Sequence, residues 1–136
     1  SIKVIAEGEG KYLGPEGGIT ATQDILSINS SFDVMVGADQ SIQGAAIVLA
    51  DEGMTGKVKL IGLGGSAPAL EGIKDGSWFG GVYGAPGDEG RYAMEAMVDA
   101  LKNGIDQGGI DPLTSVPDNG LITSGNVSKF SAQWDG

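Results

Sequence analysis

Four short runs of β-branched and aromatic residues are the first feature of the hydrophobic pattern. They cover residues 2–5, 32–36, 58–61 and 78–83. Side chains of these types favour an extended backbone, and apolar runs of this length between turn residues are typical of buried strands. The pattern therefore predicts four strands.

The segments between these runs have the spacing of amphipathic helices. Met94, Met97, Val98 and Leu101 recur at positions i, i+3, i+4 and i+7, and Gly104 follows as a helix stop. The predicted helices span about residues 17–28, 39–52, 67–75 and 87–103.

Strands that alternate with helices require crossover connections, which place the strands side by side in a parallel sheet. The predicted fold class is therefore α/β, with a parallel β-sheet. After Gly104 both periods are lost, and only Leu121 and Ile122 suggest another short strand, followed by a turn of helix that begins at Asn126. The chain thus divides into a βα-repeat lobe, residues 1–104, and a carboxyl-terminal hinge or tail segment, residues 105–136.

Composition and charge exclude several functions and kinds of site for such a fold. The 136 residues suffice for one core, and 8 Lys and Arg against 18 Asp and Glu give a net charge of −10, which argues against binding to nucleic acid. Without Cys or His, the sequence excludes disulfides, thiol nucleophiles and a Ser-His-Asp triad. It contains no metal-binding loop motif and no apolar run of the roughly 20 residues that span a bilayer.

The carboxyl ends of the strands are where a parallel sheet binds its ligands. Glycine follows every predicted strand, as expected where backbone approaches a ligand, although short loops between strand and helix favour glycine in any case. Asp39 stands at a helix start, so N-capping and accepting a ligand hydroxyl are both open to it. Gln40 offers a donor and an acceptor, and Tyr12 offers an aromatic face for a sugar ring.

Residues 62–67 match the G-x-G-x-x-A dinucleotide-binding fingerprint after a strand. The fingerprint also needs an acidic residue at the end of the next strand, and that strand ends at Tyr83 and Gly84 instead. Pro68 removes a backbone N–H from the first helical turn, where a pyrophosphate needs donors. We therefore predict that this segment binds no dinucleotide, while a small nucleotide-cofactor enzyme stays an alternative hypothesis.

Several segments together resemble a known family. They are residues 32–40, 58–65, 73–76 and 83–86, and the closing Gln133-Trp134-Asp135-Gly136. These segments resemble successive parts of type I periplasmic sugar-binding proteins, the ribose-binding-protein-like receptors of ABC importers. The resemblance covers nearly the whole chain. The ligand-sensing domains of LacI-type repressors share this fold and are the nearest alternative.

The resemblance implies a type I periplasmic-binding-protein lobe, with helices on both faces of the sheet in a three-layer α/β/α arrangement. It also implies a solute-binding component that is not an enzyme and needs no cofactor. The implied sugar-binding positions are Tyr12, Ala38, Asp39, Gln40, Leu63, Gly64, Tyr83 and Gly84. At positions 38, 64 and 84 Ala or Gly replaces the family's polar ligand groups, which points to a small sugar or polyol other than a ribose-type pentose.

The resemblance further implies partners and a location. Family proteins have two lobes, so the chain is expected to begin inside the second lobe, without a secretion signal, and the helix of residues 87–103 to belong to the partner lobe. The expected partners are the missing amino-terminal lobe or a second copy, and an importer's membrane permease on the extracytoplasmic side. Alone, the chain is expected to bind sugar weakly and to pair with a second copy or a complementary fragment through its unpaired sheet edge and the apolar stripe of the helix at residues 87–103.

Overall fold

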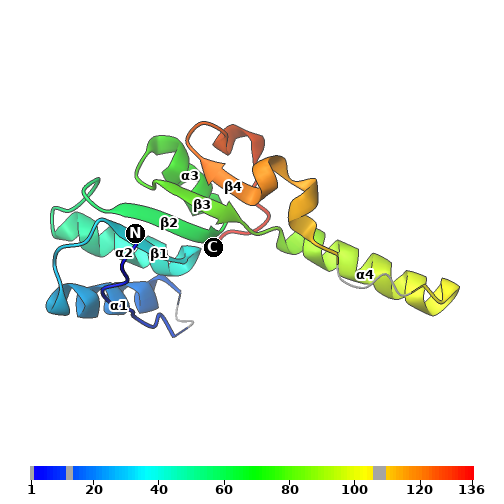
Figure 1. The fold of residues 1–136 in the computed structure, drawn as a ribbon, viewed down its shortest axis with the longest axis horizontal. Coiled ribbons are helices and arrows are strands. Elements are labelled where there is room, and N and C mark those ends of the chain that lie inside the picture. The colour runs from blue at the N-terminus through cyan, green and yellow to red at the C-terminus, as the bar shows by residue number, and fades with distance from the viewer. Residues whose placement is uncertain (1, 12–13, 106–109) are drawn as a thin grey trace.

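The computed structural model describes residues 2–11, 14–105 and 110–136. All four predicted helices are confirmed, and so are three of the four predicted strands in residues 1–104, with boundaries shifted by at most three residues. Figure 1 shows a lobe built on one sheet, from which the last long helix projects. The elements are α1 (Pro15–Ile28), β1 (Val34–Ala38), α2 (Asp39–Asp51), β2 (Lys59–Gly64), α3 (Ala67–Asp75), β3 (Gly80–Tyr83), α4 (Pro86–Asn103), η1 (Pro112–Ser115), η2 (Pro117–Gly120), β4 (Leu121–Thr123) and η3 (Val127–Lys129).

The sheet has the strand order β1-β2-β3-β4. The first three strands are parallel and are joined through α2 and α3, as the alternating pattern predicts. The short strand at Leu121 and Ile122 is also confirmed, but it pairs antiparallel with β3. The fold class is therefore α/β with a mixed sheet.

A row of glycines explains why α2 and α3 pack so closely on one face of the sheet. Gly37, Gly62 and Gly81 lie beside one another in register on β1, β2 and β3. Ile42 of α2 contacts this row at Gly37, and Ile73 of α3 contacts it at Gly81. Both isoleucines are almost completely buried, so this covered face holds the core.

The opposite face of the sheet is open in the part of the chain that the structure describes. Val36, Leu63, Val82 and Leu121 lie on this face, and 58%, 47%, 37% and 58% of their respective surfaces are exposed. The expected second helical layer is not among the described residues, because α1 packs on α2 and α3 lies on the covered face.

The prediction of a strand at residues 2–5 is wrong for this structure. Ile2 is fully exposed, Val4 is 70% exposed, and the segment has no regular hydrogen bonding. Apolar side chains favour a strand only where a neighbouring strand supplies backbone partners. β1 is the edge of the sheet, and no described segment pairs with its outer side.

Local signals set the ends of the helices well. The hydroxyl of Ser66 accepts a hydrogen bond from the backbone N–H of Ala69 at the start of α3, and Gly76 ends that helix with a left-handed φ of +87°. Gly104 ends α4 in the same way. Asn126 stands at the start of η3 as expected, although its side chain accepts a hydrogen bond from the N–H of Thr123 rather than capping the turn.

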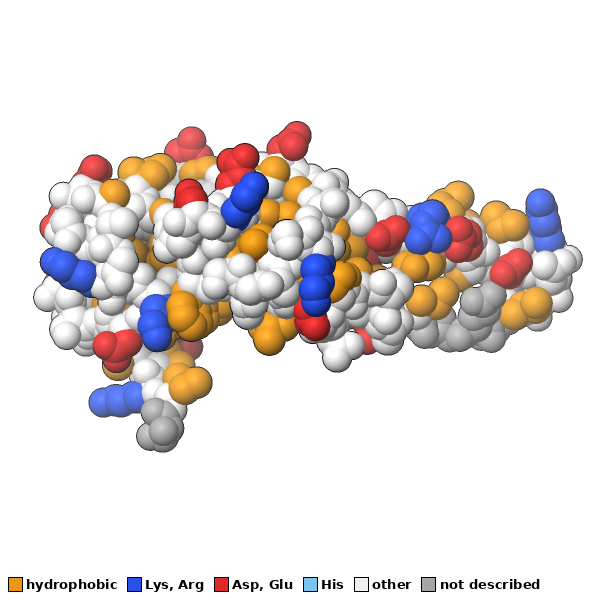
Figure 2. Space-filling view, turned by 90° about the horizontal axis from the view of Figure 1, so that it is seen from above, with side chains coloured by type: hydrophobic (Ala, Val, Ile, Leu, Met, Phe, Trp, Pro, Cys, Tyr) orange, Lys and Arg blue, Asp and Glu red, His pale blue; other side chains and the backbone are white. Residues whose placement is uncertain are grey.

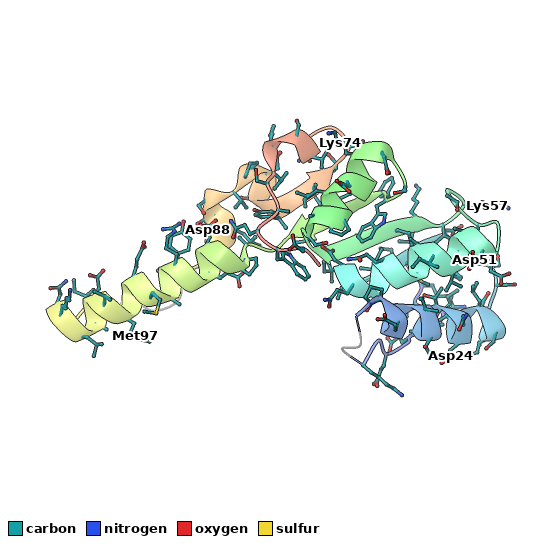
Figure 3. The ribbon with its side chains drawn as sticks, turned by 180° about the vertical axis from the view of Figure 1, so that it is seen from behind. Asp24, Asp51, Lys57, Lys74, Asp88 and Met97 are labelled. Carbon is teal, nitrogen blue, oxygen red and sulfur yellow. The ribbon has the colours of Figure 1, made fainter. Side chains whose placement is uncertain are left out.

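The helix α4 projects from the lobe (Figure 1), and Figure 2 shows hydrophobic side chains at the surface of the projecting part. None of its residues is buried, and 56% of Met97 and 80% of Leu101 are exposed. Figure 3 shows Asp88 where the helix leaves the lobe and Met97 further out along it. Among the described helices, α4 included, none is long and apolar enough to cross a membrane.

Candidate functional site

A pocket of about 390 Å³ lies at the carboxyl end of β1. Its walls come from Ala38 at the end of that strand, from the first turn of α2, and from the loop that precedes α1. The lining residues are Glu9, Gly10, Lys11, Gly14, Ala38, Gln40 and Ser41. The structure thus brings together two predicted site residues, Ala38 and Gln40, with the loop that carries the predicted Tyr12. Tyr12 itself lies outside the described residues.

The loop before α1 packs closely on α1 and α2 because glycines at the contact points leave room for its backbone. A Cβ at Gly17 of α1 would lie 1.8 Å from the carbonyl oxygen of Gly10, so no side chain fits there. A Cβ at Gly10 would meet the hydroxyl of Ser41 at 2.7 Å. Lys11, which lines the pocket, adopts a left-handed φ of +51°.

The chemistry of this pocket is that of polar recognition. Gln40 and Ser41 carry neutral groups that both donate and accept hydrogen bonds, and Glu9 and Lys11 add one acceptor and one donor of opposite charge. The described residues contain no group of three or more acidic side chains placed to hold a metal ion. The arrangement suits a ligand with several hydroxyls.

The side chain of Asp39 does not cap α2, and Asp39 is not among the residues that line the pocket. It is completely buried, and its Oδ2 accepts a hydrogen bond of 2.7 Å from the backbone N–H of Ser66. It therefore ties the start of α2 to the loop that follows β2. Its Oδ1 has no hydrogen-bond partner within the described parts of the chain.

The carboxyl-terminal tail, residues 131–136, crosses the carboxyl end of β2. The indole N–H of Trp134 donates to the carbonyl of Gly64 at 2.9 Å, and the carbonyl of Trp134 accepts from the N–H of Ala67 at 3.1 Å. In the sequence, residues 133–136 are notable only for their resemblance to the family. A contact between residues 64 and 134 leaves no periodic signal, so no local pattern could have identified it.

Tyr83 and Gly84 hold the tail and the strand ends together. Tyr83 is buried, its hydroxyl donates to the carbonyl of Ser131 at 2.6 Å, and its ring lies 5.2 Å from that of Phe130. Burial, and then the negative charge of Asp88, raise the pKa of Tyr83. The N–H of Gly84 donates to the carbonyl of Gly64. Neither residue lines the pocket, and Leu63 lies on the open face of the sheet.

Two hydrogen bonds join the start of α4 to the tail. The backbone N–H of Asp88 donates to Oε1 of Gln133 at 3.0 Å, and Nε2 of Gln133 donates to Oδ2 of Asp88 at 2.7 Å. Gln133 and then Arg91 hold the pKa of Asp88 below its ordinary value. The tail therefore fixes the point at which the projecting helix leaves the lobe (Figure 3).

The segment of residues 62–67 has few free donors for a pyrophosphate. The N–H of Ser66 binds Asp39, that of Ala67 binds the carbonyl of Trp134, and that of Ala69 binds the hydroxyl of Ser66. A buried carboxylate at this helix start would also repel an anion. These contacts support the prediction that the segment binds no dinucleotide.

The fold is similar to several solved structures. The Caulobacter myo-inositol binding protein bound to myo-inositol is 30% identical, with a TM-score of 0.71, over 87% of this chain and 40% of that one. An ABC transporter periplasmic solute binding protein from Actinobacillus succinogenes with bound D-allose is 20% identical, with a TM-score of 0.73, over 86% and 40%. A periplasmic ribose ABC transporter protein from Conexibacter woesei is 26% identical, with a TM-score of 0.62, over 71% and 33%.

This chain therefore spans 40% or less of the length of these three structures. None of the curated proteins matches it in sequence. The family model described as "Periplasmic binding protein domain" matches residues 1–105, which is most of the chain. Taken with the α/β lobe and the pocket at its strand ends, this match shows that the chain belongs to the family of periplasmic binding protein domains.

Proposed function

We propose that this chain forms one lobe of an extracytoplasmic solute-binding protein that delivers a small sugar or polyol to the membrane permease of an ABC importer. The observation that carries the proposal is the pocket at the carboxyl end of β1, because this is where ligands bind in open parallel sheets. Solved structures of similar fold include a myo-inositol binding protein bound to myo-inositol, a solute binding protein with bound D-allose and a periplasmic ribose ABC transporter.

The lining of the pocket supports a neutral, hydroxyl-bearing ligand. Gln40 and Ser41 can exchange hydrogen bonds with hydroxyls in either direction, and Glu9 and Lys11 have opposite charges. At Ala38 and Gly64 the strand ends offer no polar side chain. A ligand that presents an apolar face to these positions fits better than a ribose-type pentose that needs a hydrogen bond at each.

In this proposal the ligand is enclosed between two lobes, and α4 packs in the partner lobe. The exposed apolar stripe of α4 supports this arrangement, because an amphipathic helix needs a surface on which to bury its stripe. The similar solved structures are also more than twice as long as this chain. One open lobe buries only part of a sugar, so the chain alone binds it weakly.

Thermal unfolding in the presence of D-allose, myo-inositol or D-ribose tests the proposal. A ligand that binds only the folded chain raises its melting temperature. Sugars also stabilise proteins by being excluded from their surface, so the informative quantity is the difference between two variants. Gln40→Ala removes a pocket side chain, and Gln23→Ala removes an exposed glutamine of α1 far from the pocket lining.

We expect the wild-type chain and Gln23→Ala to be stabilised equally by at least one of these compounds. Gln40→Ala should bind it about threefold to tenfold more weakly, as expected for the loss of one or two hydrogen bonds. Equal stabilisation of both variants by all three compounds would count against a sugar site at the carboxyl end of β1.

A further inference from the structure

We propose that Trp134, in the carboxyl-terminal tail, is the aromatic wall of the ligand site and packs its ring against the C–H face of the bound sugar or polyol. This inference rests on the proposed function. It assigns the aromatic contact to a residue that follows Gln40 by more than 90 positions in the sequence. In the fold this residue lies beside the carboxyl end of β2, the strand next to β1.

The backbone around Trp134 fixes the ring at the carboxyl end of β2. Its indole N–H and its carbonyl are bound to Gly64 and Ala67, on either side of the turn between β2 and α3. Gly136 continues the tail between Gln43 of α2 and Pro68 of α3. Trp134 is thus held through its indole N–H and through its backbone carbonyl, and its side chain remains partly exposed.

Gly64 shows that the ring occupies the space of a strand-end side chain. A Cβ at Gly64 would lie 2.7 Å from Cζ2 of Trp134 and 2.9 Å from Oδ2 of Asp39. The φ of Gly64, +153°, is one that L side chains rarely adopt. No side chain from position 64 can therefore reach a ligand, and the group that the end of β2 presents in its place is the indole.

The hydrogen bonding of the indole limits what it can recognise. Its only polar group, the N–H, is taken by the carbonyl of Gly64. The exposed part of the ring is therefore an aromatic surface, which favours apolar C–H groups over hydroxyls. Sugars and polyols have both kinds of surface, with hydroxyls at the edges and C–H groups on a face.

The polar partners of such a ligand lie at the adjacent strand end. Ala38, which lines the pocket, is in register with Leu63, the residue before Gly64. Neighbouring strands are about 5 Å apart, so the end of β1 and the end of β2 are within the span of one sugar ring. Gln40 and Ser41 then bind hydroxyls on the β1 side while Trp134 covers the β2 side.

Tryptophan fluorescence of the whole chain tests this assignment, with D-allose and myo-inositol as probes. The chain has two tryptophans, and Trp78 is buried in the core. Trp78→Phe leaves Trp134 as the only tryptophan, and Trp134→Phe and Trp134→Leu leave Trp78 to report that the core is folded. Phe keeps an aromatic ring without the N–H, and Leu keeps apolar bulk without a ring.

We expect the emission of Trp134 in the Trp78→Phe chain to change in a saturable way with added sugar, while that of Trp78 in the Trp134 variants stays constant. Affinity should fall in the order Trp, Phe, Leu, with Trp134→Leu about threefold to tenfold weaker than wild type. The wild-type chain, measured in the same titrations, supplies the reference affinity. If a Trp134 variant does not fold, the response of Trp134 in the Trp78→Phe chain still tests the contact.

Two results would overturn the assignment, and they differ in what else they affect. If wild type binds sugar but Trp134→Phe and Trp134→Leu bind it equally well and the emission of Trp134 does not respond, Trp134 only anchors the tail and the proposed function stands. If neither the wild-type chain nor any variant binds a sugar, the proposed function fails together with this inference.

Discussion

Both faces of the sheet carry apolar side chains, but one face is buried and the other is exposed. On one face, Ile42 and Ile73 close over a row of glycines and are almost completely buried. On the other, Val36 and Leu63 remain about half exposed. The composition of a strand therefore predicts which of its faces is apolar, but that face is buried only where a second layer of helices or strands covers it.

The two faces of the sheet already differ in the strands themselves, because the glycine row lies on only one of them. Gly37, Gly62 and Gly81 leave the middle of the covered face without side chains of its own, so the side chains of Ile42, Trp78 and Ile73 pack directly against the backbone of the sheet. The open face has no such row, and its valines and leucines project outward. An apolar layer placed on it would pack on these side chains instead.

The largest effect should come from the covered face. Ile73→Ala removes a fully buried side chain and leaves a cavity between α3 and β3, which should lower the free energy of unfolding by about 2–5 kcal/mol. Val36→Ala on the open face is the matched control, and we expect a change below about 0.5 kcal/mol. Urea denaturation of both variants measures the difference, and equal losses would mean that the open face is buried in solution.

A methyl group added to the glycine row should also be costly. In Gly62→Ala the new Cβ would lie 2.3 Å from Oδ1 of Asp39 and 2.5 Å from the ring of Trp78, so we expect a loss of about 1–3 kcal/mol. Gly90 of α4 has no atom within 4 Å of such a Cβ. Gly90→Ala should therefore be neutral or stabilise the helix by up to about 1 kcal/mol.

The buried carboxylate of Asp39 should contribute less than its burial suggests. Asp39→Ala leaves the N–H of Ser66 without its acceptor, but it also relieves the burial of a carboxylate whose Oδ1 has no partner in the described residues. We expect a net loss of about 1 kcal/mol by thermal or urea unfolding. A loss as large as that of Ile73→Ala would indicate that Oδ1 is also well bound in the folded chain.

The smallest effect on stability should come from the open face, where the change is in association instead. The double substitution Val36→Thr and Leu63→Thr makes the open face more polar. Thr has nearly the shape of Val and is smaller than Leu, and both positions are exposed. Stability should change by less than about 0.5 kcal/mol per site. Sedimentation velocity should show less self-association than in wild type, since exposed apolar patches and open sheet edges recruit other chains. Unchanged association would place the contact elsewhere, for example on α4.

Local sequence signals predicted most of the elements, and contacts distant in sequence account for the rest. Ser66 and Gly76 set both ends of α3 because caps act within a single turn. Residues 2–5 have the composition of a strand, but no described strand lies beside them. The antiparallel direction of β4 depends on the route of the chain through α4 and back, which no local pattern records.

The same distinction between local signals and distant contacts applies to the residues of the candidate site. Ala38 and Gln40 were predictable because they follow a strand directly and so had to lie at its carboxyl end. Asp39 has the same position in the sequence, yet the N–H of Ser66, 27 residues away, determines the direction of its carboxylate. Trp134 reaches Gly64 only after the chain has completed the sheet.

The most direct test of the account is a map of amide chemical-shift changes in the 136-residue chain on titration with D-allose and myo-inositol. We expect the largest saturable changes to cluster at the carboxyl ends of β1 and β2, at Ala38, Gln40, Ser41 and Gly64. Saturable changes centred on the open face of the sheet or at its amino-terminal end, with none at these four residues, would contradict it.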